Sequence, residues 1–250
     1  MCGIAGVIGK KNNSKEIALK MAADMTYRGP DDIGVFSYKN KISIAAVRLG
    51  FVDIKNNIQP MTSLDGRHSI VFNGEIYNFR ELRSELEAKG HHFQGWSDTE
   101  VLLALYHDQG LSSVCENESI VSFLRRLNGI FSFALWDNKL KSLLLARDAL
   151  GVKPLYIQKF KDNIHFASEI KAFKPFIDLR PSTKELSEFC CFGETSSTKT
   201  IYENIYQIEP GHYLEISLND EKKLIVSGDF NEEKMKISFG KKKHYLFKLI

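Results

Sequence analysis

Short apolar runs separated by polar turns recur along the chain, and this pattern predicts β-strands. Two of the runs flank an Asp-Asn pair at positions 137–138, and together they predict a β-hairpin. The expected strands cover residues 4–8, 42–49, 69–72, 130–136, 142–146, 154–159 and 164–167. Strands therefore dominate the predicted secondary structure.

Apolar residues at helical spacing interrupt the strand pattern near the N-terminus. Ile17, Met21 and Met25 are four residues apart and predict a helix over residues 14–26. The helix cannot continue through the Arg-Gly-Pro-Asp-Asp stretch at 28–32, because proline fixes φ and glycine permits unusual φ values.

Two further helices have recognisable start or stop signals. Asn78 precedes a segment with Phe79, Leu82 and Leu86 on one face, and Gly90 stops it. The stretch Ser-Asp-Thr-Glu at positions 97–100 has the form of a capping box and predicts a helix running through position 106. A short helix is also expected at residues 123–127. Many strands with a few amphipathic helices predict helices layered on stacked sheets.

The composition changes after position 218. Residues 219–241 are polar, rich in lysine and without periodicity, which is typical of a linker. The apolar residues at 245–249 favour a helix that has just begun. We therefore expect one domain over residues 1–218, and a linker with the start of a missing or truncated C-terminal domain over residues 219–250.

Composition and charge exclude several classes of protein. Hydrophobic residues make up 43% and charged residues 26% of the 250 positions, as in ordinary globular proteins. No apolar run approaches the roughly 20 residues that span a bilayer, and no signal peptide is recognisable. The six lysines and two glutamates of residues 231–250 account for more than the whole net charge of +3. We expect a cytoplasmic protein with neither a membrane nor a nucleic-acid partner.

The four cysteines, Cys2, Cys115, Cys190 and Cys191, have no zinc-ligand spacing, so neither a metal site nor a disulfide framework is expected. Cys2 differs from the others by its position. If Met1 is removed, the thiol of Cys2 lies beside a free α-amine, whose pKa near 8 lets it accept the thiol proton without a histidine. The alternative is a small buried residue in a first strand.

Eight segments in order along residues 1–172 resemble the asparagine synthetases and related class II glutamine amidotransferases. A weaker similarity, P-G-H-Y-L at 210–214, extends the resemblance to about position 215. The segments are M-C-G-I-A-G-V at 1–7, R-G-P-D at 28–31, R-L at 48–49 with V-D at 52–53 and Q-P at 59–60, N-G-E-I-Y-N at 73–78, S-D-T-E at 97–100, G-I-F-S-F-A-L-W-D at 129–137, A-R-D-A-L-G-V-K-P-L-Y at 146–156 and A-S-E-I-K-A at 167–172.

The resemblance implies an α+β fold, the four-layer αββα sandwich of the N-terminal-nucleophile hydrolases. It also implies the role of Cys2 as the nucleophile that releases ammonia from glutamine through a γ-glutamyl thioester. The side chain of Asn73 and the backbone N–H of Gly74 would form the oxyanion hole.

The resemblance assigns three more residues to glutamine binding. Arg48 would hold the substrate α-carboxylate, Asp98 would accept its α-ammonium, and Glu75 would line the same pocket. Each assignment has a structural alternative. Asp98 could only favour the helix dipole, Asn73 and Gly74 could form a hairpin turn, and Arg48 could be a surface charge at a strand end.

Some positions depart from the family pattern or stay outside the expected site. Many relatives have histidine where this chain has Tyr27, or at one of the two positions 46–47, and Gly50 replaces a small serine or alanine. Arg147 and Asp148 are interpreted as a structural pair at a strand end, and Lys153 and Lys171 are likewise not counted as catalytic.

The chain lacks the S-G-G-x-D-S-S loop with which asparagine synthetases bind ATP, and it has no P-loop. No cofactor is expected here, because ATP and Mg²⁺ would serve only the absent synthetase domain. The expected partners are glutamine and a C-terminal synthetase domain or partner subunit, and a homodimer stays open. Two alternatives remain, a glutaminase that serves another acceptor such as a sugar and a non-catalytic scaffold of the same fold.

Overall fold

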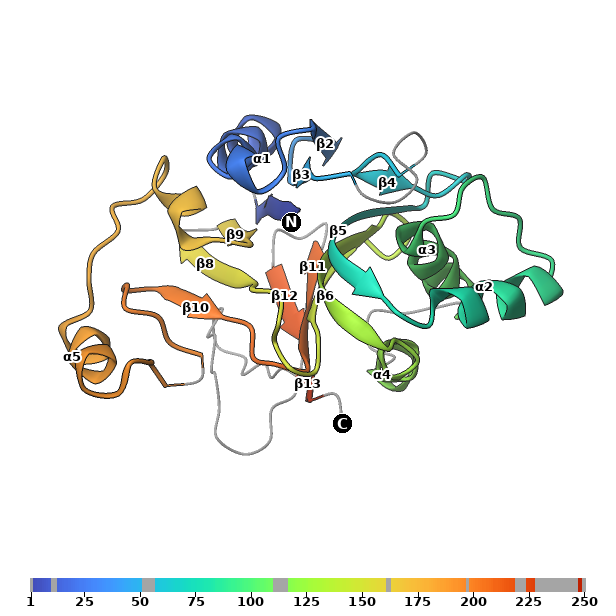
Figure 1. The fold of residues 1–250 in the computed structure, drawn as a ribbon. Helices are drawn as coiled ribbons and strands as arrows, with labels where there is room; N and C mark the ends of the chain where they lie inside the picture. Colours follow the sequence, from blue (N-terminus) through green and yellow to red (C-terminus); the bar gives the residue numbers. More distant parts are fainter. Residues whose placement is uncertain are drawn as a thin grey trace.

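The computed structural model describes residues 2–9, 13–50, 57–109, 117–160, 163–196, 198–218, 224–227 and 247–248. Two antiparallel sheets form the centre of the molecule, and helices cover their outer faces (Figure 1). No helix among these residues is both long and apolar enough to cross a membrane.

The first sheet carries the N-terminal strand near its middle. Its order is β10-β8-β9-β1-β3-β2, with Gly3 of β1 opposite Val47 of β3, and Ala5 opposite Ala167 of β9. The strands are β1 (Gly3–Gly9), β2 (Asp32–Tyr38), β3 (Ile42–Arg48), β8 (Tyr156–Phe160), β9 (Asn163–Ala167) and β10 (Ile205–Gln207).

The second sheet has the order β12-β11-β7-β6-β5-β4, and β13 pairs with β11 off this path. Its strands β6 and β7 form the hairpin predicted around positions 137–138. The strands are β4 (Met61–Thr62), β5 (His68–Ile76), β6 (Gly129–Asp137), β7 (Ser142–Arg147), β11 (His212–Leu218), β12 (Leu224–Ser227) and β13 (Phe247–Lys248).

The helices begin where the sequence signals predict for α2 and α3. Ser97 caps α3 by accepting the N–H of Glu100 at 3.2 Å. The Glu100 carboxylate instead accepts the N–H groups of Gln94 at 2.7 Å and Gly95 at 2.9 Å, so only half of the capping box forms. The helices are α1 (Ser14–Ala23), α2 (Phe79–Ala88), α3 (Asp98–Asp108), α4 (Asn117–Arg125) and α5 (Thr183–Phe192), with 3-10 turns η1 (Thr26–Arg28) and η2 (Ile170–Phe173).

Three apolar cores separate four layers. In β1, Ile4 and Ile8 point into the core between the sheets, whereas Ala5 and Val7 face the core beneath α1, as the two-residue period of a strand requires. The outer face of β5 and β6 packs against α2, α3 and α4 (Figure 1). The α+β, four-layer αββα sandwich implied by the resemblance is therefore confirmed.

Several elements were missed by the sequence analysis. The strands β2, β4 and β10 lie at sheet edges and are short or half-buried, whereas β11, which the apolar pattern also did not predict, is buried within its sheet. The helix α5 has readable signals, because Ser182 precedes it, and Gly193 ends it with a left-handed φ of 76°.

The C-terminal expectations have mixed outcomes. Residues 224–227 form β12 within the segment interpreted as a linker, and it pairs with β11. Residues 247–248 form β13, so the helix expected near the end is wrong at these two positions. Tyr245, Leu246 and Leu249 lie outside the described residues. The domain boundary at position 218 stays a prediction.

Candidate active site

The N-terminal end of β1 is held from two sides. Arg28 Nε donates to the carbonyl of Cys2 at 3.0 Å, and Ser168 Oγ accepts the N–H of Ile4 at 3.0 Å. Cys2 is half-buried just before the strand, and its Sγ lies 3.9 Å from the carbonyl of Leu49. These contacts fix the backbone that carries the thiol.

Tyr27 contributes to this support. Its hydroxyl donates to Glu169, and the same carboxylate pairs with Arg28 at 2.6 Å. Burial alone would raise the pKa of Glu169, but the hydrogen bonds from Tyr27 and Arg28 lower it overall. A charged Glu169 therefore steadies the arginine that holds Cys2.

The Arg-Gly-Pro-Asp turn packs against the end of β3. A Cβ on Gly29 would lie 2.5 Å from the carbonyl carbon of Arg48, so only glycine fits there. Asp31 donates its N–H to the carbonyl of Arg48 at 3.1 Å, and its carboxylate accepts the N–H of Gly50 at 2.8 Å. The turn thereby fixes the backbone around Arg48, whose side chain is largely buried.

Only Ser69 and Ile70 of β5 pair with β4, and beyond them the same edge of β5 presents backbone N–H groups to side chains. The N–H of Phe72 donates to Gln59 Oε1 at 2.7 Å, and the N–H of Ile76 donates to Asp98 Oδ2 at 3.0 Å. Because backbone groups alternate along a strand, the N–H of Gly74 points to the same edge, between these two.

Asn73 and Gly74 lie within β5, opposite Ser132 and Phe131 of β6, so the hairpin-turn alternative is wrong. Asn73 is 1% exposed, and its Nδ2 has no hydrogen-bond partner among the described residues. A Cβ on Gly74 would lie 2.2 Å from the carbonyl oxygen of Ile130. Glycine is therefore required at position 74 so that β6 can lie close to β5. It also leaves the edge of β5 uncovered by a side chain at this position.

Asp98 is the first residue of α3, after the Ser97 cap. Burial raises the pKa of its carboxyl, the negative charge of Glu75 adds to the shift, and N–H groups of Ile76 and Thr99 oppose it. Its net raised pKa shows that the carboxylate lacks full compensation for its burial. A cation placed beside it would supply that compensation.

All the predicted site residues line one cavity of about 320 Å³. The cavity wall combines the half-buried thiol, a guanidinium, a buried amide, a strand edge and a buried carboxylate. The lining residues are Cys2, Arg48, Leu49, Gly50, Asn57, Gln59, Phe72, Asn73, Gly74, Glu75, Phe79, Asp98, Thr99, Ile130 and Lys153.

Lys153 reaches this cavity through a loop that Arg147 and Asp148 organise. Asp148 Oδ2 accepts the N–H of Lys153 at 3.0 Å and that of Phe131 at 3.2 Å. Arg147 donates to the carbonyls of Lys153 at 2.8 Å and Gly151 at 2.6 Å. The two residues bind backbone groups of the loop, and this explains their place in the Arg-Asp motif.

Gln59 and Lys153 are two of the cavity residues that were not predicted as site residues from the sequence; the others are Leu49, Gly50, Asn57, Phe72, Phe79, Thr99 and Ile130. Gln59 belongs to the Gln-Pro segment of the resemblance, and Lys153 stands between Gly151 and Pro154 of another motif. Membership of a motif was therefore the available signal, although it gave neither residue a chemical role. None of the histidines among the described residues lines the cavity.

A model of the glutamine amidotransferase domain matches residues 1–225 of the chain. Asparagine synthetase [glutamine-hydrolyzing] 3 of Bacillus subtilis is 39% identical over 225 residues, which cover 87% of this chain and 35% of the relative. Asparagine synthetase [glutamine-hydrolyzing] 2 of the same organism is 35% identical over 239 residues, with 91% and 30% covered. The chain thus spans about a third of the length of these relatives.

A solved structure has the same fold. The glutamine phosphoribosylpyrophosphate amidotransferase of Bacillus subtilis, complexed with ADP and GMP, superimposes with a TM-score of 0.64 at 23% identity. The superposition covers 90% of this chain and 49% of that one.

Proposed function

Because the chain belongs to the family of class II glutamine amidotransferase domains, we propose that it hydrolyses glutamine to glutamate and ammonia with Cys2 as the nucleophile. The Cys2 thiolate attacks the side-chain carbonyl carbon of glutamine. The C–N bond then breaks, the leaving amide nitrogen takes up the proton removed from the thiol and departs as ammonia, and water hydrolyses the thioester to glutamate. Cys2 is thereby regenerated.

The single observation that carries this proposal is the amide of Asn73. Its Nδ2 is buried without a partner among the described residues and lines the same cavity as Cys2. An unpaired buried donor costs stability, and an oxyanion that forms on the attacked carbonyl would satisfy it. The N–H of Gly74 is the second donor, and such pairs stabilise the developing charge by several kcal/mol.

Arg48 and Asp98 account for the recognition of a free amino acid. The guanidinium of Arg48 would hold the α-carboxylate, preferably through two parallel hydrogen bonds. The carboxylate of Asp98, whose pKa is raised by burial, would regain charge compensation from the α-ammonium. Glu75 lines the same cavity and adds negative charge on the ammonium side.

The proton of the Cys2 thiol needs an acceptor. Among the described residues no histidine lines the cavity. When Cys2 is the first residue of the chain, its own α-amine has a suitable pKa, near 8, and lies within the same residue. We therefore assign the α-amine as the base, with removal of Met1 as the condition.

The ammonia acceptor is proposed to be an activated aspartate, as in an asparagine synthetase. Sequence identity of 35% and 39% with two asparagine synthetases over most of the chain supports this choice. The ATP and Mg²⁺ needed to activate aspartate would bind to a synthetase domain or partner subunit. Delivery to another acceptor, such as a sugar, is the second candidate, because the glutaminase chemistry would be the same.

The purified chain should release glutamate and ammonia from glutamine, and it should not convert ATP to AMP in the presence of aspartate. Coupled glutamate and pyrophosphate assays measure both. The matched control is Cys2→Ala, which should abolish glutamate release while the thermal melt stays cooperative. Persistent glutaminase activity in Cys2→Ala would overturn the proposed nucleophile, and an inactive wild-type chain with Cys2 exposed as first residue would favour a scaffold.

A further inference from the structure

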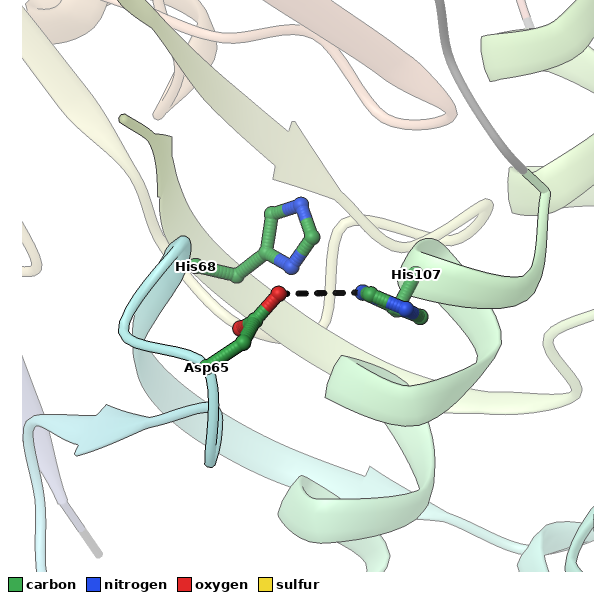
Figure 2. Close-up of side chains that lie close together, drawn as sticks. All are labelled: Asp65, His68 and His107. Atoms are coloured by element: carbon green, nitrogen blue, oxygen red, sulfur yellow. Dashed lines mark ion pairs between the residues drawn. The ribbon is translucent and has the colours of Figure 1, made fainter. Parts of the chain in front are cut away.

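A second group of ionisable side chains lies at the other end of α3 from the glutamine cavity. Asp65 follows β4, His68 begins β5, and His107 is near the C-terminal end of α3. Figure 2 shows a carboxylate oxygen of Asp65 between the imidazole rings of His68 and His107. One ligand atom from each residue lies within 4.8 Å of the other two, and Asp65 Oδ2 is 3.9 Å from His107 Nδ1.

We propose that Asp65, His68 and His107 bind a divalent metal ion of the zinc class. Imidazole nitrogen and carboxylate oxygen are ligands that Zn²⁺ prefers, at about 2.0–2.2 Å. Tetrahedral coordination at these bond lengths separates neighbouring ligand atoms by roughly 3.4 Å. A small inward movement of the two exposed residues, Asp65 and His107, would close the site around His68.

The buried histidine provides the strongest support. His68 is 1% exposed, and its Nδ1 has no hydrogen-bond partner among the described residues. Its Nε2 lies 3.3 Å from Asp137 Oδ2. Because a neutral imidazole has one donor and one acceptor nitrogen, donation to Asp137 leaves a lone pair on Nδ1. That lone pair is buried without a protein partner, which costs stability unless a metal ion or similar group accepts it.

Asp137 is held so that it can orient this imidazole. Its oxygens also accept the N–H groups of Lys139 at 2.7 Å and Leu140 at 3.0 Å, and Arg67 Nη2 at 2.8 Å. A carboxylate behind a metal-bound histidine is the usual arrangement in metal sites, because it fixes the tautomer and raises ligand basicity.

The other two proposed ligands, Asp65 and His107, place Oδ2 and Nδ1 where they could bind the ion. Asp65 Oδ1 accepts the hydroxyl of Ser63 at 2.6 Å and the N–H of Arg67 at 3.0 Å, so that Oδ2 faces His107. Asp65 and His107 also line a cavity of about 410 Å³, whose wall includes His91 and His92. This cavity supplies an entry path and a place for a water or other fourth ligand.

The spacing of the four cysteines predicts no metal site, and this cluster contains no cysteine. Here Asp65 and His68 are close in the chain, but His107 comes from a helix that follows a long intervening segment. The site joins the 63–67 turn, β5 and α3, and it is separate from the glutamine cavity. Its failure or success in a test is therefore independent of the proposed glutaminase.

The test is a Zn²⁺ titration of the full chain without a histidine tag, after removal of metal with EDTA. All four cysteines are replaced by serine so that thiolates cannot bind the metal. Competition with a chromophoric chelator should give one equivalent of bound Zn²⁺. Metal-bound protein should melt at a higher temperature than metal-free protein, because the ion binds only the folded state.

Variants in the same background locate the site. Asp65→Asn and His107→Gln should each weaken Zn²⁺ binding by at least about 100-fold, since loss of a ligand exceeds the effect of losing an outer partner. His92→Gln, which changes a histidine of the same cavity outside the cluster, should leave the affinity unchanged. Circular dichroism of the metal-free variants controls for folding.

Three results would overturn the proposal. They are no bound Zn²⁺ at micromolar metal, an affinity that survives both Asp65→Asn and His107→Gln, and an equal loss of affinity in His92→Gln.

Discussion

At the residue scale, Asn73 and Asp98 line one cavity, but they would act on different steps. Asn73 would stabilise the transition state, whereas Asp98 would stabilise the bound substrate in the ground and transition states alike. Asn73 offers a neutral donor with no partner among the described residues, and a charge that develops during the reaction would use it. Asp98 offers a charge, and the α-ammonium that would meet it is present equally in the ground and transition states. The two residues can therefore be separated by kinetics.

Replacing Asn73 by alanine should lower kcat by roughly 10²–10³ and change KM little, as for other oxyanion donors. Steady-state glutaminase assays measure both constants, and a thermal melt controls for folding. A raised KM with an unchanged kcat would contradict the assignment of Asn73 as an oxyanion donor.

Replacing Asp98 by asparagine should raise KM for glutamine and leave kcat nearly unchanged, because uniform binding is lost. The same variant should melt at a higher temperature than the wild type at neutral pH. The pKa of Asp98 is raised by burial, so the folded protein binds a proton more tightly there than the unfolded chain, and ionisation of Asp98 destabilises the fold.

This stability difference has a defined pH dependence. It should be largest above the raised pKa of Asp98 and shrink as the pH falls towards the ordinary value of 3.8. Differential scanning calorimetry of both proteins from pH 4 to pH 7 measures it. A wild type that is more stable than Asp98→Asn at neutral pH would contradict the account.

At the element scale, β5 is the structure that the site depends on most. The apolar run predicts a strand over residues 69–72, but β5 continues through Gly74 to Ile76. The Asn-Gly pair resembles a turn, and glycine is rare in strands, so local propensity ended the strand too early. Pairing with β6 decides the conformation, and only the fold reveals it.

Replacing Gly74 by alanine should destabilise the protein by about 1–3 kcal/mol, the usual effect of overpacking. The added Cβ would lie 2.2 Å from the carbonyl oxygen of Ile130, so β5 and β6 must separate. Because that movement shifts both oxyanion donors, kcat should fall as well. Urea unfolding and steady-state kinetics test both effects, and a variant with wild-type stability would show that β6 does not restrict this position.

At the scale of the whole molecule, the sandwich brings together segments that are far apart in the chain. Cys2, Arg48, Asn73, Asp98 and Lys153 come from five segments and line one cavity. The pattern of short apolar runs predicts most of the central strands, because both of their faces are buried and apolar. It cannot predict which strand ends meet.

For the cavity, the order of motifs supplied what periodicity could not. The resemblance identifies the residues that stand at the family's functional positions, namely Cys2, Arg48, Asn73, Gly74, Glu75 and Asp98. Gln59 reaches the cavity wall through its contact with Phe72, and Lys153 through a loop that Asp148 holds; hydrophobic periodicity predicts neither contact. Periodicity does not predict the group of Asp65, His68 and His107 either, because its members lie on a turn, a strand and a helix.

The identity of the nucleophile is tested most directly by covalent labelling. A glutamine-mimicking diazoketone, incubated with the purified chain, should attach as one label per protein molecule. The intact mass should then equal that of a protein that begins at Cys2 plus one label. Peptide mapping should place the label on Cys2 alone, and excess glutamine should prevent it. A label on Cys115, Cys190 or Cys191 with Cys2 unmodified would contradict the account.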